Sequence, residues 1–149
     1  MTRIALKFAS LATVLSFIGM LAAPVFTYAA SPAPMEIKVR VSEKGFADEQ
    51  GRPYGPNRPL KIQQGTPVTL VFVFSENVSS LAVGDTHQIA LRSDAGQVGE
   101  TEKLWVMNKQ SSISFRAGDK GQLQYRAYCI LDCIGMEHLT NLVIQVVTA

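Results

Sequence analysis

The strongest strand pattern in the sequence is PVTLVFVF, at residues 67–74. Its bulky apolar side chains recur with the period of two that places them on one face of a β-strand: Val68, Leu70, Phe72 and Phe74. The other face also carries valines, and a strand that is apolar on both faces is typical of the covered centre of a sheet. We therefore predict a central strand here, within a layered β-structure.

Segments of similar length and pattern lie on both sides of this central strand. Residues 36–41 read EIKVRV, in which charged and apolar residues alternate, as in a half-buried strand. Further strands are predicted at residues 59–63, 86–91, 103–107, 111–117, 122–129 and 141–147. Met35, Trp105 and Met107 are expected to be packing residues in this framework.

The segments between the predicted strands carry turn and loop signals. Glycine, proline or polar residues dominate residues 51–59, 75–85, 92–101 and 118–121. The sequence shows no alternation of strand and helix patterns after the first thirty or so residues. We therefore predict an all-β fold, a two-sheet antiparallel Greek-key sandwich.

The N-terminus has the features of a signal peptide. Arg3 and Lys7 form a short basic region, and the apolar run at residues 8–23 carries no charge. Pro24 then ends any helix, and residues 27–29 (TYA) place small side chains where a signal peptidase cleaves. The alternative is an uncleaved membrane anchor, but the run is shorter than the about 20 residues that span a bilayer comfortably.

The chain therefore divides into three parts. We predict a signal peptide at residues 1–29, a linker at residues 30–34 and one domain at residues 35–149. Cleavage after Ala29 would release the domain, without stable membrane insertion, into an exported and oxidising compartment such as the periplasm.

Composition and charge narrow the function classes. The chain has 149 residues, of which 47% are hydrophobic, enough for one domain with its own core. Without Arg3 and Lys7 its basic and acidic residues balance, and no basic run remains, so a nucleic-acid partner is not expected. The sequence contains no Ser/His/Asp order and no glycine-rich phosphate loop that stands out, so we predict that the protein is not an enzyme.

Metal-binding residue types gather near the C-terminus. Residues 128–138 read YCILDCIGMEH and contain both cysteines, one of the two histidines and one of the five methionines. Thiolate, imidazole and thioether groups are the donors that select copper. The segment lies between the predicted strands at residues 122–129 and 141–147, so it is a loop.

The other histidine, His87, begins the predicted strand at residues 86–91. If this strand runs antiparallel beside the strand that ends at Cys129, the start of one lies beside the end of the other. The two side chains then meet at one end of the sandwich, between the sheets. We predict a copper centre there, with one or two ions held by His87, Cys129, Cys133, Met136 and His138.

These features together resemble the cupredoxins, which are sandwich proteins with a distant histidine, a strand that ends in cysteine and a ligand loop before the last strand. The likeness covers residues 35–147. The spacing Cys-x-x-x-Cys is similar to that of the dinuclear copper domain of cytochrome c oxidase subunit II and nitrous-oxide reductase. That resemblance implies that Cys129 and Cys133 are the thiolates and that His87 is the upstream histidine.

The ligand loop departs from the pattern of that domain, Cys-x-x-x-Cys-x-x-x-His-x-x-Met. Glu137 stands where the second histidine belongs, and Thr140 stands where the methionine belongs. His138 follows one residue later, and Met136 precedes it. A loop can absorb an insertion of one residue, so His138 can still reach a metal.

Several models of the site remain open. Both cysteines can bridge two coppers, or one copper can bind in the Cys-x4-His segment from Cys133 to His138. A homodimer can also share one site between its chains. The metal-free alternative is a disulfide between Cys129 and Cys133, since a loop allows the Cα distance below about 7 Å that a disulfide needs.

The resemblance implies that the cupredoxin-like domain at residues 35–149 carries electrons or handles copper. Its partner is then a redox partner protein or a copper-accepting protein. The alternative function is a metal-free accessory or binding module of the same fold, with its two cysteines oxidised.

Overall fold

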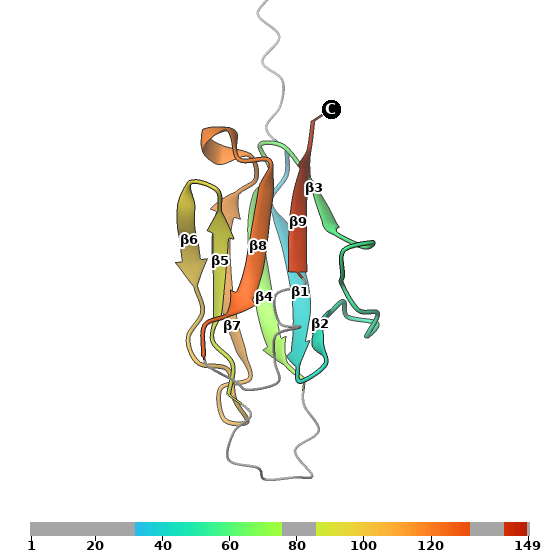
Figure 1. Cartoon of the computed structure of the whole chain (residues 1–149), viewed down its shortest axis with the longest axis vertical. Helices are drawn as coiled ribbons and strands as arrows, with labels where there is room; N and C mark the ends of the chain where they lie inside the picture. Colours follow the sequence, from blue (N-terminus) through green and yellow to red (C-terminus); the bar gives the residue numbers. More distant parts are fainter. Residues whose placement is uncertain (1–31, 76–85, 132–141, 149) are drawn as a thin grey trace, which may run out of the picture.

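The computed structural model describes residues 32–75, 86–131 and 142–148, so the predicted signal peptide lies outside the described residues. Within these ranges the chain forms two β-sheets that pack face to face as two layers (Figure 1). The four-stranded sheet has the order β2 (Gly45–Ala47), β1 (Met35–Ser42), β4 (Pro67–Phe74) and β7 (Gln110–Arg116). The five-stranded sheet has the order β3 (Leu60–Gln63), β9 (Leu142–Val147), β8 (Gln124–Cys129), β5 (Ile89–Ser93) and β6 (Gly96–Glu100). The predicted all-β, two-sheet sandwich is confirmed.

Both sheets are mixed, so the prediction of antiparallel pairing throughout is wrong. Strands β1 and β4 are parallel neighbours, and so are β3 and β9. Between β1 and β4 the chain crosses to the other sheet as β3, so it returns in the direction in which β1 runs. A period of two identifies a strand but not its direction, which is why the sequence could not distinguish these pairs.

The structure also changes the list of predicted strands. The described residues add β2 and β6, of which β6 lies in a segment predicted as a polar loop and is the edge strand beside β5. Residues 103–107 form no continuous strand. Leu104 makes an isolated bridge with His87, and the chain bends after it, with a 2.9 Å hydrogen bond from the Trp105 amide to the Asn108 carbonyl. The expected packing role is wrong for three residues that are exposed: Met35, Trp105 and Met107.

Helix is nearly missing from the described part of the chain. A single three-residue 3-10 turn, η1 (Asp119–Gly121), occupies the predicted turn before β8. Among the described residues, no helix has the length and apolar character needed to cross a membrane.

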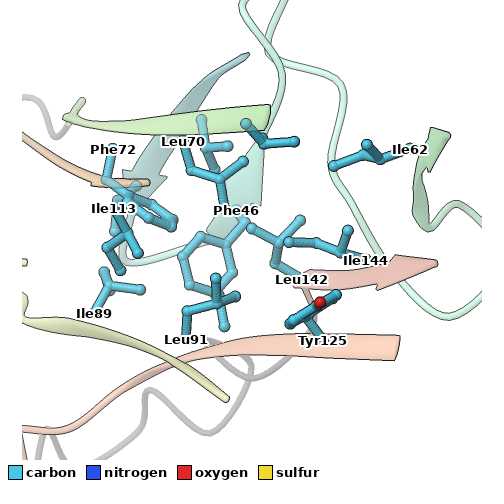
Figure 2. Close-up of a cluster of buried hydrophobic side chains, with 14 of the residues drawn as sticks. Phe46, Ile62, Leu70, Phe72, Ile89, Leu91, Ile113, Tyr125, Leu142 and Ile144 are labelled. Atoms are coloured by element: carbon cyan, nitrogen blue, oxygen red, sulfur yellow. The ribbon is translucent and has the colours of Figure 1, made fainter. Parts of the chain in front are cut away.

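The core forms where β4 faces the five-stranded sheet. Alternate side chains of β4 are buried, which confirms the predicted pattern: Val68, Leu70, Phe72 and Phe74. Figure 2 shows side chains of the two layers facing one another, with Leu70, Phe72, Phe46 and Ile113 opposite Ile89, Leu91, Tyr125, Leu142 and Ile144. Full burial of one such side chain stabilises the fold by about 1.5–3 kcal/mol. The packing between the two sheets therefore determines which strand ends lie next to each other.

Strands β6 and β7 close one side of the sandwich at short range. A Cβ atom built on Gly99 would lie 2.9 Å from Cγ2 of Ile113, whose side chain is buried. Carbon atoms in proteins do not pack this closely, because dispersion attraction between them is optimal near about 3.5–4.0 Å. Glycine at this position therefore lets the two edge strands approach.

Two arginines fix the loop after β2 around a buried carboxylate. Asp48 accepts hydrogen bonds from the Arg52 amide at 2.9 Å, from Arg52 Nε at 2.7 Å and from the Arg58 guanidinium. The Arg58 guanidinium also lies 5.1 Å from the ring centroid of Tyr54. Burial raises the pKa of Asp48, but the hydrogen bonds from Arg52 and Arg58 outweigh that effect and lower the pKa to about 2.

The close approach at Gly99 gives a test of the fold. We expect Gly99→Ala to lower the free energy of unfolding by about 1–3 kcal/mol, because the added methyl overpacks against Ile113. Urea denaturation followed by circular dichroism measures this change. Gly55→Ala is the matched control, since nothing lies within 4 Å of its Cβ position. Equal losses in the two variants would contradict the short contact.

The ion cluster at Asp48 makes stability depend on pH. Because the pKa falls from 3.8 to about 2 on folding, the contribution of the carboxylate is complete above the unfolded pKa and disappears as the pH falls through the folded one. We expect Asp48→Asn to destabilise the protein at neutral pH, with the difference from wild type shrinking between about pH 4 and about pH 2. Urea melts across this range measure the trend. Glu49→Gln, which removes an exposed neighbouring carboxylate, should not reproduce it.

Candidate metal centre

His87 lies just before β5, at the end of the sandwich where that strand begins. Its backbone forms a bridge with Leu104: the His87 amide donates to the Leu104 carbonyl at 2.9 Å, and the Leu104 amide donates back at 2.7 Å. The imidazole is buried, and its ring centroid lies 5.9 Å from that of Phe74, the last residue of β4. The fold therefore fixes the position of this ring from two sides.

Cys129 is the last residue of β8, which lies beside β5 in the sheet (Figure 1). The antiparallel register pairs Cys129 with Ile89, and the Ile130 amide extends the ladder by donating to the Gln88 carbonyl at 2.8 Å. The half-buried thiol of Cys129 lies close enough to the His87 side chain for the two groups to interact. The predicted antiparallel pairing of these two strands is confirmed, and so is the expectation that His87 and Cys129 meet.

The surroundings of Cys129 favour its thiolate form. Burial raises the pKa of the thiol, but the hydrogen bond with His87 lowers it. Backbone hydrogen bonds at Gln88 and Leu131 and the charge of His87 act in the same direction, so the pKa lies below the ordinary value for cysteine. The thiolate is the form of cysteine that binds metals, so this environment suits a ligand.

A buried threonine supports the strand that carries His87. Thr101 Oγ1 accepts a hydrogen bond from the Ile89 amide at 2.9 Å, and the Thr101 amide donates to the Ile89 carbonyl at 2.8 Å. Thr101 is itself buried, and Ile89 lies opposite Cys129 in the ladder. The sequence does not reveal the role of Thr101, because this residue ends a segment predicted as a polar loop and no local pattern marks its contact with Ile89.

The other predicted ligands lie outside the described residues: Cys133, Met136 and His138. Within the described ranges, no group of three or more His, Cys, Asp or Glu side chains gathers around one point. The structure therefore brings two of the five predicted ligands together, His87 and Cys129. The complete set stays a prediction.

A hollow of about 310 Å³ lies at the far ends of β5 and β8 from this pair. Its lining includes Ser93, Gln97, Arg116 and Tyr125, and it does not include His87 or Cys129. The hollow is therefore separate from the candidate centre.

Comparison with solved structures identifies the fold. Auracyanin B matches 80% of this chain and 92% of its own chain, at 16% identity and a TM-score of 0.51. Auracyanin A, a "blue" copper protein from Chloroflexus aurantiacus, matches 76% of this chain and 99% of its own, at 15% identity and a TM-score of 0.50. Rusticyanin from Thiobacillus ferrooxidans matches 80% of this chain and 80% of its own, at 15% identity and a TM-score of 0.50. No family model and no curated protein matches the sequence.

At this level of identity the likeness defines the architecture alone. The chain has the cupredoxin fold, in two layers whose strands β5 and β8 carry the candidate centre at one end. The narrower resemblance to the dinuclear copper domain remains a prediction from the spacing of Cys129 and Cys133.

The support from Thr101 can be measured as stability. We expect Thr101→Val to lower the free energy of unfolding by about 1–3 kcal/mol, because valine keeps the volume but leaves the buried Ile89 amide without its acceptor. Thr101→Ser keeps the hydroxyl and should retain most of the stability. Chemical denaturation of the metal-free, reduced protein measures both variants. A valine variant as stable as wild type would contradict the role of this hydrogen bond.

Proposed function

We propose that this chain is an exported, copper-binding protein of cupredoxin fold that transfers electrons to or from a redox partner protein. The contact between His87 and Cys129 carries the proposal. Two residues far apart in the sequence, each of a type that binds copper, meet at the end of adjacent strands. The signal-like features of residues 1–29 support export to the periplasm or a similar compartment.

The donor set fits copper. His87 would supply an imidazole and Cys129 a thiolate, and the adjoining segment carries the further proposed ligands Cys133, Met136 and His138. These sulfur and nitrogen donors suit both common oxidation states of copper, whereas oxygen donors dominate the sites of magnesium and calcium. Bound copper would supply the one-electron chemistry that the side chains lack.

The chain's own residues would hold the ligands in place. Hydrogen bonds to Leu104 and the ring of Phe74 fix His87, and the ladder with β5 fixes Cys129. Buried side chains, including Ile89 and Leu104, surround the buried His87. A rigid frame lowers the rearrangement that accompanies a change of oxidation state, which favours an electron carrier over an enzyme with a substrate cleft.

Copper titration tests this proposal. We expect the mature, reduced protein to bind copper in preference to zinc, because affinity for such donors rises toward copper along the divalent series. His87→Ala should weaken copper binding at least tenfold, which corresponds to about 1.4 kcal/mol. Met35→Leu, at an exposed methionine by the opposite end of β4 from the Phe74–His87 contact, is the matched control and should bind as wild type does. No copper binding by thiol-intact protein would overturn the proposal.

Cysteine variants separate the models of the site. Cys129→Ser should abolish the thiolate-to-copper absorption band in a dinuclear site and in a mononuclear site that uses Cys129. Cys133→Ser should reduce a dinuclear site to one copper or none, and it should spare a mononuclear site at Cys129. If Cys129→Ser keeps the band and Cys133→Ser loses it, the Cys133–His138 model holds. Binding that is insensitive to both cysteines would contradict every model with a thiolate ligand.

The copper-handling and metal-free alternatives predict different results for copper binding and copper release. A copper carrier would release Cu(I) to a competing chelator or acceptor protein within its working time, whereas an electron carrier would keep copper through reduction and reoxidation. An accessory module would have a Cys129–Cys133 disulfide and would bind copper neither before nor after reduction.

A further inference from the structure

The outer face of the five-stranded sheet carries two arginines directly opposite each other. The antiparallel register of β5 and β8 pairs Arg92 with Arg126, and both residues are exposed. Their neighbours Leu91 and Ala127 are buried, so the arginines point away from the core. Side chains that face each other in this way have Cβ atoms about 4.5–5.5 Å apart, and like charges at that distance destabilise a sheet.

The described part of the chain does not compensate these charges. Its ion pairs join Lys38 to Glu49 and Asp48 to two arginines of the loop after β2, and none involves Arg92 or Arg126. The acidic residue on the adjoining edge strand, Glu100, instead accepts a hydrogen bond from Gln97 at 3.1 Å. Among the described residues, no carboxylate therefore forms an ion pair with either of these two guanidinium groups.

The rest of this outer face carries one further cation, Lys61 on β3, one carboxylate, Glu100 on β6, and a series of amides: Gln88, Gln97, Gln124 and Gln145. Its apolar members on β9 are Val143, beside Arg126, and Val147. Two guanidinium groups side by side offer paired donors that match carboxylates in a bidentate manner, and arginine is enriched where proteins bind each other. A face with such donors suits a partner surface that presents carboxylates.

The two arginines lie on the same pair of strands as the candidate centre. Arg126 and Cys129 lie on the same strand, separated by about 10 Å at a rise of about 3.3 Å per residue. Tyr128, half-buried, lies between them on the arginine side of the sheet, opposite Ala90. A partner seated on the arginines would therefore lie close to the metal-binding end of β8.

We propose that this face, centred on Arg92 and Arg126, docks a protein partner through a cluster of carboxylates on the partner's surface. Binding itself depends on charge and shape, and only the partner's role as an electron donor or acceptor rests on the proposed function. An anionic membrane is the weaker fit, because polybasic membrane sites use clusters of about four to eight cations and this face presents three.

Titration with a glutamate-rich decapeptide tests the proposal by amide chemical shifts in the 15N-labelled, metal-free, reduced protein. We expect the largest shifts at residues of β5 and β8 and a loss of binding as ionic strength rises, since exposed charges are screened. The double variant Arg92→Gln/Arg126→Gln should bind at least tenfold more weakly. Arg92→Lys/Arg126→Lys keeps the charge but not the paired donors, and it should give an intermediate affinity.

The matched control is Arg40→Gln/Lys44→Gln, which removes the same charge from exposed positions on the other sheet and its turn. It should bind within about twofold of wild type, and an equal loss there would show that only net charge matters and would overturn the proposal. Phosphatidylglycerol vesicles that bind through Arg92 and Arg126, with no peptide binding, would overturn the assignment to a protein partner. Because the protein holds no metal in this experiment, its failure is distinguishable from a failure to bind copper.

Discussion

The hydrogen-bonded ladder between β5 and β8 is the interaction on which the rest of the molecule's chemistry depends. Its register pairs Ile89 with Cys129 and continues to the bond between Ile130 and Gln88, so His87 lies beside the cysteine. Side chains alternate between the faces of a strand, so a slip by one residue would turn Cys129 outward and bring Arg126 into the core. The burial of Leu91 and Ala127 opposes that slip, and packing of the sandwich thereby fixes the candidate centre.

The same alternation separates two kinds of chemistry on one pair of strands. The inner face carries the buried His87 and the half-buried Cys129, whose surroundings favour the thiolate. The outer face carries Arg92 and Arg126, whose charges would be costly to bury without partners. The two arginines and the His87–Cys129 pair lie on or next to the same two hydrogen-bonded strands. The register of these strands therefore fixes the position of one pair relative to the other.

Much of the fold follows from patterns that a sequence displays locally. The period of two in β4, and the alternation in β1, reflect one buried face and are visible without any knowledge of neighbours. Strand β6 was missed because an edge strand with glycines at 96 and 99 has little apolar surface to reveal it. Trp105 was predicted to lie in a strand because its segment has strand-like composition. The structure instead shows a bend, with a hydrogen bond from the Trp105 amide to the Asn108 carbonyl. Parallel pairing could not be predicted, since it depends on how the chain crosses between sheets.

The candidate site likewise has features that could be predicted from the sequence and features that could not. The meeting of His87 and Cys129 was predictable, because antiparallel neighbours place the start of one strand beside the end of the other. The Leu104 bridge and the Thr101 hydrogen bonds were not, because they are contacts with a third segment that no local pattern marks. Strand ends have fewer ladder bonds than strand centres, and local opening is easiest there. A centre at the end of β5 and β8 therefore needs such support: Leu104 and Thr101 hold the first residues of β5 from the side opposite β8, and the ladder alone could not fix His87.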